Sequence, residues 1–378
     1  MDKVLFITDL HTGAHVIEIA GVCERAACYG WRVIEIERDR TTRPLTEFVR
    51  TWRPAGCIME CGQLTESVDT DGLGIPVVYI DPPPQTLERG CLSVANDADA
   101  IAAMALRELM PLECASFAYV GWCERTNWSV GRCEAFRRRL AQSGLACDVY
   151  DAPWHDPVAV QKDLAAWLKK LKPRAGVLAA NDYAAVQVAG ACEIAGLESP
   201  SDIAIVGVDN DALLCENTFP TLTSIELDFK EAGRLAADLL HDVIAGECRG
   251  GNAWLSFGPL SLARRQSTRL VNSLDRRIVR AVERIRRDAC MGIKAADIIA
   301  ETGLSRRLVE KRFFEATGRT ILGEIREVRF EKAFEILRDK TIPVGRIPEL
   351  CGWESDSYFK RAFKSRTGMT PREWRKKH

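Results

Sequence analysis

At 378 residues with 47% hydrophobic side chains, the chain is long enough for two or three domains with real cores, and no uncharged stretch could span a bilayer. Its 14 cysteines show no Cys-x-x-Cys spacing and no leader peptide opens the sequence, which argues against a zinc site or a secreted disulfide framework and favours a cytoplasmic protein. The net charge of −1 divides unevenly, because residues 270–378 hold 26 Lys and Arg against 16 Asp and Glu, a net of +10, and residues 1–269 carry −11. Such a split is typical of a nucleic-acid-binding region joined to a region of another kind.

Short apolar runs rich in β-branched residues alternate with longer helical patterns over residues 1–265. The predicted strands are Val4–Thr8, Val33–Ile36, Gly56–Glu60, Val77–Ile80, Phe117–Val120, Gly176–Ala179 and Ile203–Val208. The predicted helices between them are Val16–Tyr29, Ala98–Leu109, Val130–Ser143, Pro157–Leu171 and Ala184–Ala195. This alternation predicts an α/β fold with parallel sheets covered by helices on both faces, and the number of βα units favours two doubly wound lobes.

Polar and aromatic residues follow several of these predicted strands. In open α/β sheets ligands bind beyond the carboxyl ends of the strands, and two facing lobes can close on a small molecule. Carboxylates, amides and a guanidinium pair with sugar hydroxyls, while a tryptophan face covers the apolar side of a sugar ring. Taken singly, each Asp is as easily a helix cap and each Trp a core residue. Together they predict a polyol site, whose candidate effector-binding residues are Asp9, Asp81, Trp128, Arg132, Asn181, Asp182 and Asp209.

The stretch from Gly176 to Asn210 resembles the effector domain of the LacI/GalR family, which is itself similar to periplasmic sugar-binding proteins. The matching residues are Asn181-Asp182, Gly196, Pro200 with Asp202, Val206-Gly207-Val208-Asp209, Leu222-Thr223-Ser224-Ile225 and Arg264-Arg265-Gln266-Ser267-Thr268. Arg132 stands three residues before Ala135-Phe136, where the family has an effector-contacting arginine before Gly-Phe. The resemblance implies a two-lobed sensor domain of the periplasmic-binding-protein-like type I fold over residues 1–265. It also implies effector contacts for Arg132, Asp182 and Asp209.

A short polar connection at residues 266–274 leads into a basic, helical region that begins with a predicted helix at Asp275–Ala289. One pattern then occurs twice: a short helix, a glycine turn, and a second helix that ends at Thr-Gly. The first copy consists of Ala295–Glu301, Gly303-Leu304 and a helix Arg306–Ala316 capped by Ser305. The second consists of Val344–Cys351, Gly352-Trp353 and a helix from Ser355 or Asp356 to about Arg366, and Ile321–Arg338 joins the copies. The pattern predicts an all-α domain at 275–378 with two helix-turn-helix units, at about 295–316 and 344–366.

The second helix of each unit has one face for packing and one for DNA. Val309 and Phe313 in the first copy, and Phe359 and Phe363 in the second, are expected to anchor the helix, so the opposite face can enter a major groove. Any one exposed charge there is more often an ordinary surface residue, but two copies within a segment of net +10 favour DNA contacts. The candidate DNA-binding residues are Arg306, Arg307, Lys311, Ser357, Lys360, Arg361 and Lys364.

The same region resembles the AraC/XylS family over essentially its whole length. The matching residues are Gly352-Trp353, Tyr358-Phe359, Arg361-x-Phe363-Lys364, Gly368-x-Thr370-Pro371 and Trp374-Arg375. Pro348 stands where the family has a small alanine, so the first helix of the second unit is expected to be kinked or to begin late. A LacI-like sensor ahead of an AraC-type module resembles the xylose operon regulator subgroup. That resemblance implies a transcription activator with double-stranded DNA, a pentose such as D-xylose, a second copy of itself and RNA polymerase as partners.

Two other classes of protein remain as alternatives. For an enzyme, the five histidines form no metal-spaced pair and no Gly-x-Ser-x-Gly or phosphate-loop motif occurs, so we predict no catalytic residue, metal or cofactor. A DNA-repair methyltransferase carrying an AraC-type module would need clustered, metal-activated thiolates, and the cysteines are scattered. A cytoplasmic sugar-binding protein with no transcriptional role would leave the duplicated basic motif without a purpose.

Overall fold

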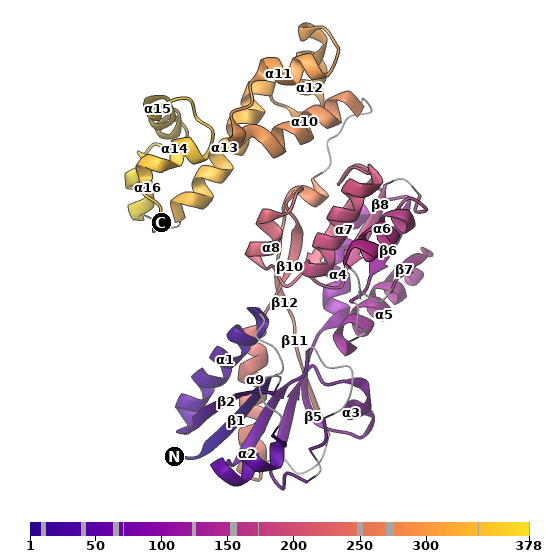
Figure 1. Ribbon diagram of the computed structural model, residues 1–378, viewed down its shortest axis with the longest axis vertical. Helices are drawn as coiled ribbons and strands as arrows, with labels where there is room; N and C mark the ends of the chain where they lie inside the picture. Colours follow the sequence, from indigo (N-terminus) through magenta and orange to yellow (C-terminus); the bar gives the residue numbers. More distant parts are fainter. Residues whose placement is uncertain are drawn as a thin grey trace. The chain divides into compact units, whose positions relative to one another are not determined.

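The computed structural model describes residues 1–8, 13–38, 43–62, 68–70, 72–122, 126–151, 157–172, 174–247, 252–269, 276–338 and 340–377. The chain forms two compact units, Met1–Arg269 and Leu270–His378. As predicted, the first unit is α/β and the second is helical (Figure 1). None of the helices in the described ranges is both long enough and apolar enough to cross a membrane.

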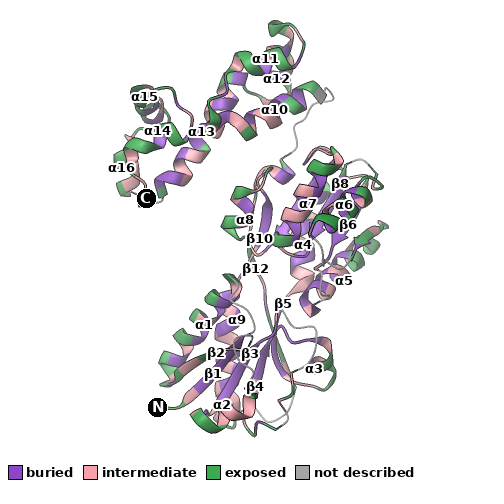
Figure 2. Cartoon of the chain, in the orientation of Figure 1, coloured by how far each residue is buried: buried purple, intermediate pink, exposed green. Residues whose placement is uncertain are grey.

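The first lobe, here called the N-lobe, is built on a six-stranded sheet of order β11-β5-β4-β3-β1-β2, in which every pair is parallel. Its strands are β1 (Lys3–Thr8), β2 (Arg32–Glu37), β3 (Gly56–Glu60), β4 (Val77–Ile80), β5 (Leu92–Asn96) and β11 (Ala253–Phe257). Its helices are α1 (Gly13–Tyr29), α2 (Leu45–Trp52), α3 (Pro84–Glu88) and α9 (Phe229–Ile244). β3 and β5 are buried along their whole length, as expected for parallel strands covered on both faces (Figure 2).

The second lobe, here called the C-lobe, has a six-stranded sheet of order β12-β10-β9-β8-β6-β7. Its strands are β6 (Ser116–Val120), β7 (Cys147–Tyr150), β8 (Ala175–Ala179), β9 (Ile203–Val208), β10 (Thr223–Leu227) and β12 (Pro259–Ala263). Its helices are α4 (Ala98–Leu109), α5 (Asn127–Gln142), α6 (Pro157–Leu168), α7 (Asp182–Ala195) and α8 (Ala212–Asn217). The predicted parallel pairing holds for every pair of this sheet but one, because β12 runs antiparallel to β10. β12 follows β11 of the N-lobe, so the chain comes back into the C-lobe sheet in the direction opposite to that in which β10 leaves it.

The lobes are not successive pieces of the sequence, because the chain passes between them three times. α9 follows β10 of the C-lobe but packs against α1 of the N-lobe, and β11 then returns the chain to β12. The approach of α1 and α9 requires glycine, since a Cβ on Gly233 would lie 2.0 Å from the carbonyl oxygen of Glu18. The crossing strands are tied by backbone hydrogen bonds from Asp97 to Phe257 (2.8 Å) and from Asp228 to Gly258 (3.3 Å). These crossings are where a hinge between the lobes would lie.

The second unit contains α10 (Arg276–Asp288), α11 (Ala295–Glu301), α12 (Arg306–Thr317), α13 (Ile321–Arg338), α14 (Ile347–Leu350), α15 (Asp356–Thr367) and α16 (Pro371–Lys377). It has two small cores, one centred on Phe313 and the other on Phe359 and Phe363. α13 runs between them and contributes buried residues to both. From this helix, Arg329 donates to the carbonyl oxygens of Ala289 (2.8 Å) and Ile293 (3.1 Å), so its charge serves internal packing.

Pro348 delays the start of a helix and does not kink one. Residues Val344–Arg346 form a 3-10 turn, and α14 begins after it, with Pro348 in its first turn. The amides of a first helical turn have no partner within the helix, so the missing N–H of proline costs no hydrogen bond there. The expected helix Val344–Cys351 is therefore correct in position but is divided into two short segments.

Candidate functional site

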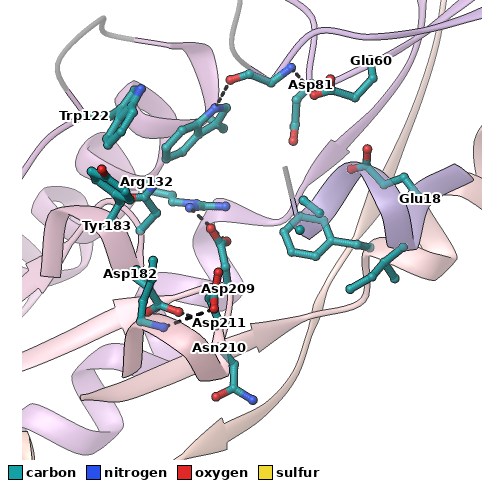
Figure 3. Close-up of a pocket in the computed structure, with 18 of the residues that line it drawn as sticks. Glu18, Glu60, Asp81, Trp122, Arg132, Asp182, Tyr183, Asp209, Asn210 and Asp211 are labelled. Atoms are coloured by element: carbon teal, nitrogen blue, oxygen red, sulfur yellow. Dashed lines mark hydrogen bonds and ion pairs between the residues drawn. The ribbon is translucent and has the colours of Figure 1, made fainter. Parts of the chain in front are cut away.

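A cavity of about 480 Å³ is lined by residues of both lobes beyond the carboxyl ends of their strands (Figure 3). Glu18, Glu60 and Asp81 line it from the N-lobe. Six of the seven predicted effector-binding residues line it as well: Asp81, Trp128, Arg132, Asn181, Asp182 and Asp209. The seventh, Asp9, and the neighbouring His11 lie outside the described residues. The tertiary structure thus brings together side chains that are spread over more than 100 positions of the sequence.

Arg132, from the second turn of α5, is the buried cation of this cavity, with 3% of its surface exposed. Its Nη1 donates to the carbonyl oxygen of Ala180 at 2.6 Å, and its Nε donates to Oδ1 of Asn96 at 3.3 Å. The guanidinium lies 4.6 Å from the ring centre of Trp128, a cation–π contact. These contacts leave Nη2 without a partner among the described residues. A buried arginine held this firmly can present fixed donors to a ligand.

Asp81 and Asp209 present carboxylate oxygens that the protein does not fully use. Asp81 accepts from the backbone and side-chain amides of Asn96, at 3.1 and 3.0 Å, both through Oδ1. Asp209 lies 3.9 Å from Nη1 of Arg132, and its Oδ1 is buried without a hydrogen bond. Burial raises the pKa of Asp209 to about 7, because the effect of Arg132 in lowering that pKa does not offset desolvation together with the nearby carboxylates. Burial also raises the pKa of Asp81.

Asp182 and Asn181 support the cavity wall. Oδ1 of Asp182 accepts from the Ser224 hydroxyl at 2.5 Å and its Oδ2 accepts from the amide of Asp211 at 2.7 Å. Burial raises the pKa of Asp182 to about 6 against these two hydrogen bonds. Oδ1 of Asn181 caps α7 by accepting from the amide of Ala184 at 2.9 Å. Both residues therefore have structural partners already, as expected for residues at a strand end that opens a helix.

Glu18 is a cavity residue that the sequence interpretation missed. It lies in the second turn of α1, is 3% exposed, and its Oε2 is buried with no hydrogen-bond partner. Its pKa is raised well above the ordinary value, first by burial and then by Glu60, Asp81 and Asp209. A signal was present, because Glu18 shares the buried stripe of α1 with Gly21, Val22 and Ala26 at helical spacing. A charged residue on the core face of a helix was the feature to examine.

Aromatic side chains form the apolar part of the cavity lining. Trp128 is buried, and its indole N–H donates to the carbonyl oxygen of Gly62, which joins the two lobes. Trp122 and Tyr183 meet edge to face at 5.7 Å, and half of the Tyr183 side chain is exposed. Phe229, at the start of α9, completes this lining. Flat apolar faces beside unpaired carboxylates suit a ligand with hydroxyl groups on a compact ring.

The balance of donors and acceptors defines what this cavity can bind. Glu18, Asp81 and Asp209 all offer acceptor oxygens, whereas Arg132 is the one guanidinium or ammonium group among the described lining residues. Such a site favours a neutral ligand with several O–H donors and disfavours an anion. Within the described ranges, no group of three or more His, Cys, Asp or Glu side chains is arranged to hold a metal ion.

The seven predicted DNA-binding residues are all exposed on the second helices of the two helix-turn-helix units. They are Arg306, Arg307 and Lys311 on α12, and Ser357, Lys360, Arg361 and Lys364 on α15. The opposite faces are anchored by Val309 and Phe313, and by Phe359 and Phe363, each 1% exposed or less. The exposed and buried residues therefore lie on separate faces of each helix.

The two helices differ in how they begin, but each carries a lysine that pairs with a carboxylate one turn away, and on α12 Lys311 lies 3.8 Å from Glu315. Ser355 caps α15 by accepting from the amide of Tyr358 at 3.2 Å, whereas Ser305 occupies the cap position of α12 without a side-chain hydrogen bond. Lys360 pairs with Asp356 at 2.5 Å on α15. Arg366, at the end of that helix, is held by Glu327 and lies over Phe330, so it serves the core.

Comparisons with known proteins agree with both halves of this description. A periplasmic binding protein-like domain family matches residues 106–268, and a helix-turn-helix domain family matches residues 298–377. The xylose operon regulatory proteins of Haemophilus influenzae and Escherichia coli are 30% and 31% identical to this chain, over 75% of it and 74% and 73% of their own lengths. A solved structure described as the xylose-binding transcription activator xylR has a TM-score of 0.81 at 25% identity, covering 99% of this chain and 97% of that one. The structure of a transcriptional regulator CelR–cellobiose complex shares the fold over 71% of this chain and 84% of its own, with a TM-score of 0.60 at 20% identity.

Proposed function

This chain belongs to the family of the xylose operon regulatory proteins, and from that premise we propose that a small sugar held between the lobes of residues 1–269 controls its binding to DNA. Residues 270–378 would then be the DNA-binding region of a sequence-specific transcription regulator. The observation that carries the proposal is the convergence of six predicted sugar-contacting residues on one cavity.

D-xylose is the effector that we propose. It is uncharged and carries four hydroxyl groups in its ring form, which suits a cavity rich in acceptors with one guanidinium among its described residues. Arg132, Asp81 and Asp209 would bind the hydroxyls, and the face of Trp128 or Trp122 would cover the ring. Asp182 and Asn181 would hold the strand ends in place, and Asp9 remains a predicted contact. The names of the relatives support D-xylose, whereas the cavity by itself supports a neutral polyol.

DNA binding would use the exposed faces of α12 and α15. Each helix would enter a major groove, and the two units of one chain would cover successive segments of one DNA face, about 10 bp apart. Arg306, Arg307 and Arg361 could read base edges, while Lys311, Lys360 and Lys364 would contact phosphates. We further propose that the protein acts as a homodimer and as an activator that contacts RNA polymerase. Closure of the lobes on the sugar would then re-space the two DNA-binding regions.

The test is isothermal titration calorimetry of the full chain with D-xylose, and with L-arabinose, D-ribose and D-glucose for comparison. We expect saturable binding that is tightest for D-xylose, with a matching rise in melting temperature. Binding of fluorescent promoter DNA would be measured in the same samples, with and without the sugar. Tightest binding to another pentose would change the effector assignment. The absence of binding to every sugar would overturn the proposal for the cavity, and the absence of salt-sensitive DNA binding would overturn it for the second unit.

A further inference from the structure

We propose that Arg265 is a positioning residue that couples the cavity to the end of the first unit by holding the loop Asp209–Asp211. This loop, here called the cavity loop, follows β9 and carries Asp209 into the cavity. The inference rests on the proposed function, because it assigns a route by which a bound sugar could alter DNA binding. No sugar contact is assigned to Arg265 itself.

The cavity loop has a backbone that needs outside support. Asp209 has a φ of 105° and Asn210 a φ of 55°. Both lie in the left-handed region of backbone conformation, which residues other than glycine rarely adopt. Consecutive residues in this region cost free energy and persist only where surrounding contacts hold them. The backbone amides of Asn210 and Asp211 donate to the Ser224 hydroxyl (3.0 Å) and to Asp182 (2.7 Å). These contacts fix the amides and leave the Asn210 side chain to be held by another group.

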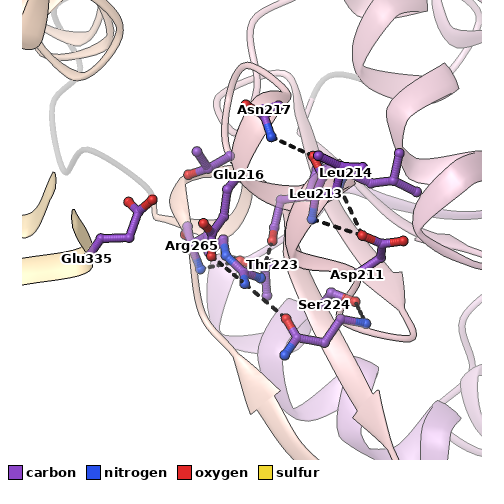
Figure 4. Close-up of polar contacts among 12 residues, drawn as sticks. Asp211, Leu213, Leu214, Glu216, Asn217, Thr223, Ser224, Arg265 and Glu335 are labelled. Atoms are coloured by element: carbon purple, nitrogen blue, oxygen red, sulfur yellow. Dashed lines mark hydrogen bonds and ion pairs between the residues drawn. The ribbon is translucent and has the colours of Figure 1, made fainter. Parts of the chain in front are cut away.

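Arg265 supplies that remaining contact. Its Nη2 donates to Oδ1 of Asn210 at 2.9 Å and lies 3.5 Å from Oε1 of Glu216 on α8. Its Nη1 donates to the carbonyl oxygen of Leu222 at 3.0 Å, and the side chain is 17% exposed. Figure 4 shows the guanidinium among residues of α8 and β10, next to the cavity loop. One side chain therefore ties together the loop, the helix that follows it and the next strand.

The segment after Arg265 is fixed firmly to the C-lobe. The Ser267 hydroxyl donates to the carbonyl oxygen of Ile205 at 2.6 Å and accepts from the amide of Thr223 at 2.9 Å. The Thr268 hydroxyl donates to Glu108 at 2.7 Å, and Ser267 and Thr268 are both buried. The first unit ends at Arg269, after which the chain continues into the second unit. Arg265 thus stands between a loop that lines the cavity and the anchored segment from which the DNA-binding region extends.

A sugar that hydrogen-bonds Asp209 would favour one conformation of the cavity loop. Because Asn210 is the next residue and Arg265 holds it, the position of the guanidinium would change together with that of the loop. The segment after Arg265, which leads to the second unit, would then have a different free energy in the occupied and empty states of the cavity. Such a difference is the requirement for coupling between two sites. Spatial proximity alone does not demonstrate such coupling, so a measurement of the coupling itself is needed.

Arg264 provides a matched control. It is adjacent in sequence, but its side chain is 67% exposed and contacts Glu108 at 2.7 Å instead of the cavity loop. Because Glu108 also accepts from Thr268, this variant perturbs the anchor of the segment after Arg265 without removing a contact to the loop. The variants to compare are Arg265→Gln and Arg264→Gln in the full chain. For each, calorimetry gives the Kd for D-xylose, and fluorescence anisotropy gives the Kd for promoter DNA without sugar and with saturating D-xylose. The ratio of the two DNA constants is the coupling factor.

We expect Arg265→Gln to reduce the coupling factor at least fivefold, toward a value of one, while Arg264→Gln keeps the wild-type factor. By reciprocity, DNA should also lose its effect on the D-xylose Kd in Arg265→Gln. A purely structural role would weaken D-xylose binding but leave the coupling factor at saturation unchanged, and that result would overturn the inference. If Arg265→Gln does not fold, Asn210→Gly takes its place, because it tolerates the positive φ and removes the acceptor. If the Kd of the wild-type protein for DNA is the same with and without D-xylose, that result would instead overturn the proposed function.

Discussion

The two candidate sites of this protein use charged side chains in opposite ways. In the first unit Arg132, Asp81 and Asp182 are buried; Arg132 donates to the carbonyl oxygen of Ala180, and the two carboxylates accept from Asn96 and Ser224. In the second, the candidate DNA-binding cations stand exposed on α12 and α15, where some pair only with a carboxylate of the same helix. A buried charge is costly to leave unpaired, so its position is tightly specified, whereas an exposed charge is screened and tolerates change.

Because of this difference, the two sites should respond differently to substitutions, pH and salt. Cavity residues should show large, position-specific effects and a dependence on pH, because burial moves their pKa values. DNA-facing residues should show smaller effects that depend on salt, because each phosphate contact releases counterions.

Arg132→Ala should weaken D-xylose binding by at least about 100-fold, because it leaves Asp81 and Asp209 buried without their cation. DNA affinity in the absence of sugar should stay within a factor of two. Calorimetry and DNA anisotropy on the same preparation measure both. Loss of DNA binding without sugar would show that Arg132 supports the whole protein and does not act only in the cavity.

Arg361→Ala should weaken specific DNA binding by about 1–3 kcal/mol, roughly 5- to 150-fold, if Arg361 contacts a base edge. The loss should be concentrated at one position of the operator in a binding-site scan. Arg372→Ala, an exposed arginine of α16 outside the predicted set, is the control and should change affinity little. Equal losses in the two variants would indicate a general electrostatic effect and remove Arg361 from the base-reading residues.

Glu18→Ala should lower D-xylose affinity about 10-fold, since it removes a buried carboxyl group that has no other partner. Glu18→Gln should lower it less, because an amide keeps the shape of the side chain and one acceptor oxygen. Glu24 lies on the same helix but pairs with Arg234 and does not line the cavity. Glu24→Ala should therefore leave D-xylose binding unchanged. Titrations at one pH and temperature compare the three variants, and an unchanged Glu18→Ala would exclude Glu18 from the site.

The stability of the first unit should fall as the pH rises from 5 to 8. Asp182 and Asp209 have pKa values of about 6 and about 7 in the folded protein, above the 3.8 of an ordinary aspartate. The folded state therefore holds these protons to a higher pH than the unfolded state, and their stabilising contribution is lost as the pH passes through the folded pKa values. Asp209→Asn should remove the part of this pH dependence that Asp209 contributes. Between pH 5 and pH 8, the melting temperature of the wild type should therefore fall by roughly 2–5 °C relative to that of the variant. Differential scanning calorimetry of both proteins at pH 5 and pH 8 tests this, and a constant difference would contradict it.

Much of the fold could be predicted from the local pattern of apolar and polar residues. The strands Gly56–Glu60, Val77–Ile80 and Ile203–Val208 and the helices Ala98–Leu109 and Ile321–Arg338 were predicted with the bounds that the structure gives. Their apolar runs or helical spacing are long enough to define the element without its neighbours. The helices and strands that were not predicted are β5, β7, β10, β11, β12, α2, α3, α8, α9 and α16. Several of these are short or polar at the surface, and β11 and β12 are edge strands in which only Phe257 is buried.

Composition and periodicity specified two kinds of region: an acidic α/β region with polar residues at strand ends, and a basic region with a repeated helix-turn-helix pattern. Tertiary structure decided which of those residues meet, because α9 and β11 return the chain to the N-lobe and place Glu18 opposite Arg132 and Asp209. Tertiary contacts also give Asp182 hydrogen bonds from Ser224 and from the amide of Asp211, while it stays a predicted sugar contact, and they place Arg265 against the cavity loop. The physical reason is that local periodicity specifies which face of an element is buried. Which partner fills that face, and which buried charge is left without one, depends on contacts between residues far apart in the chain.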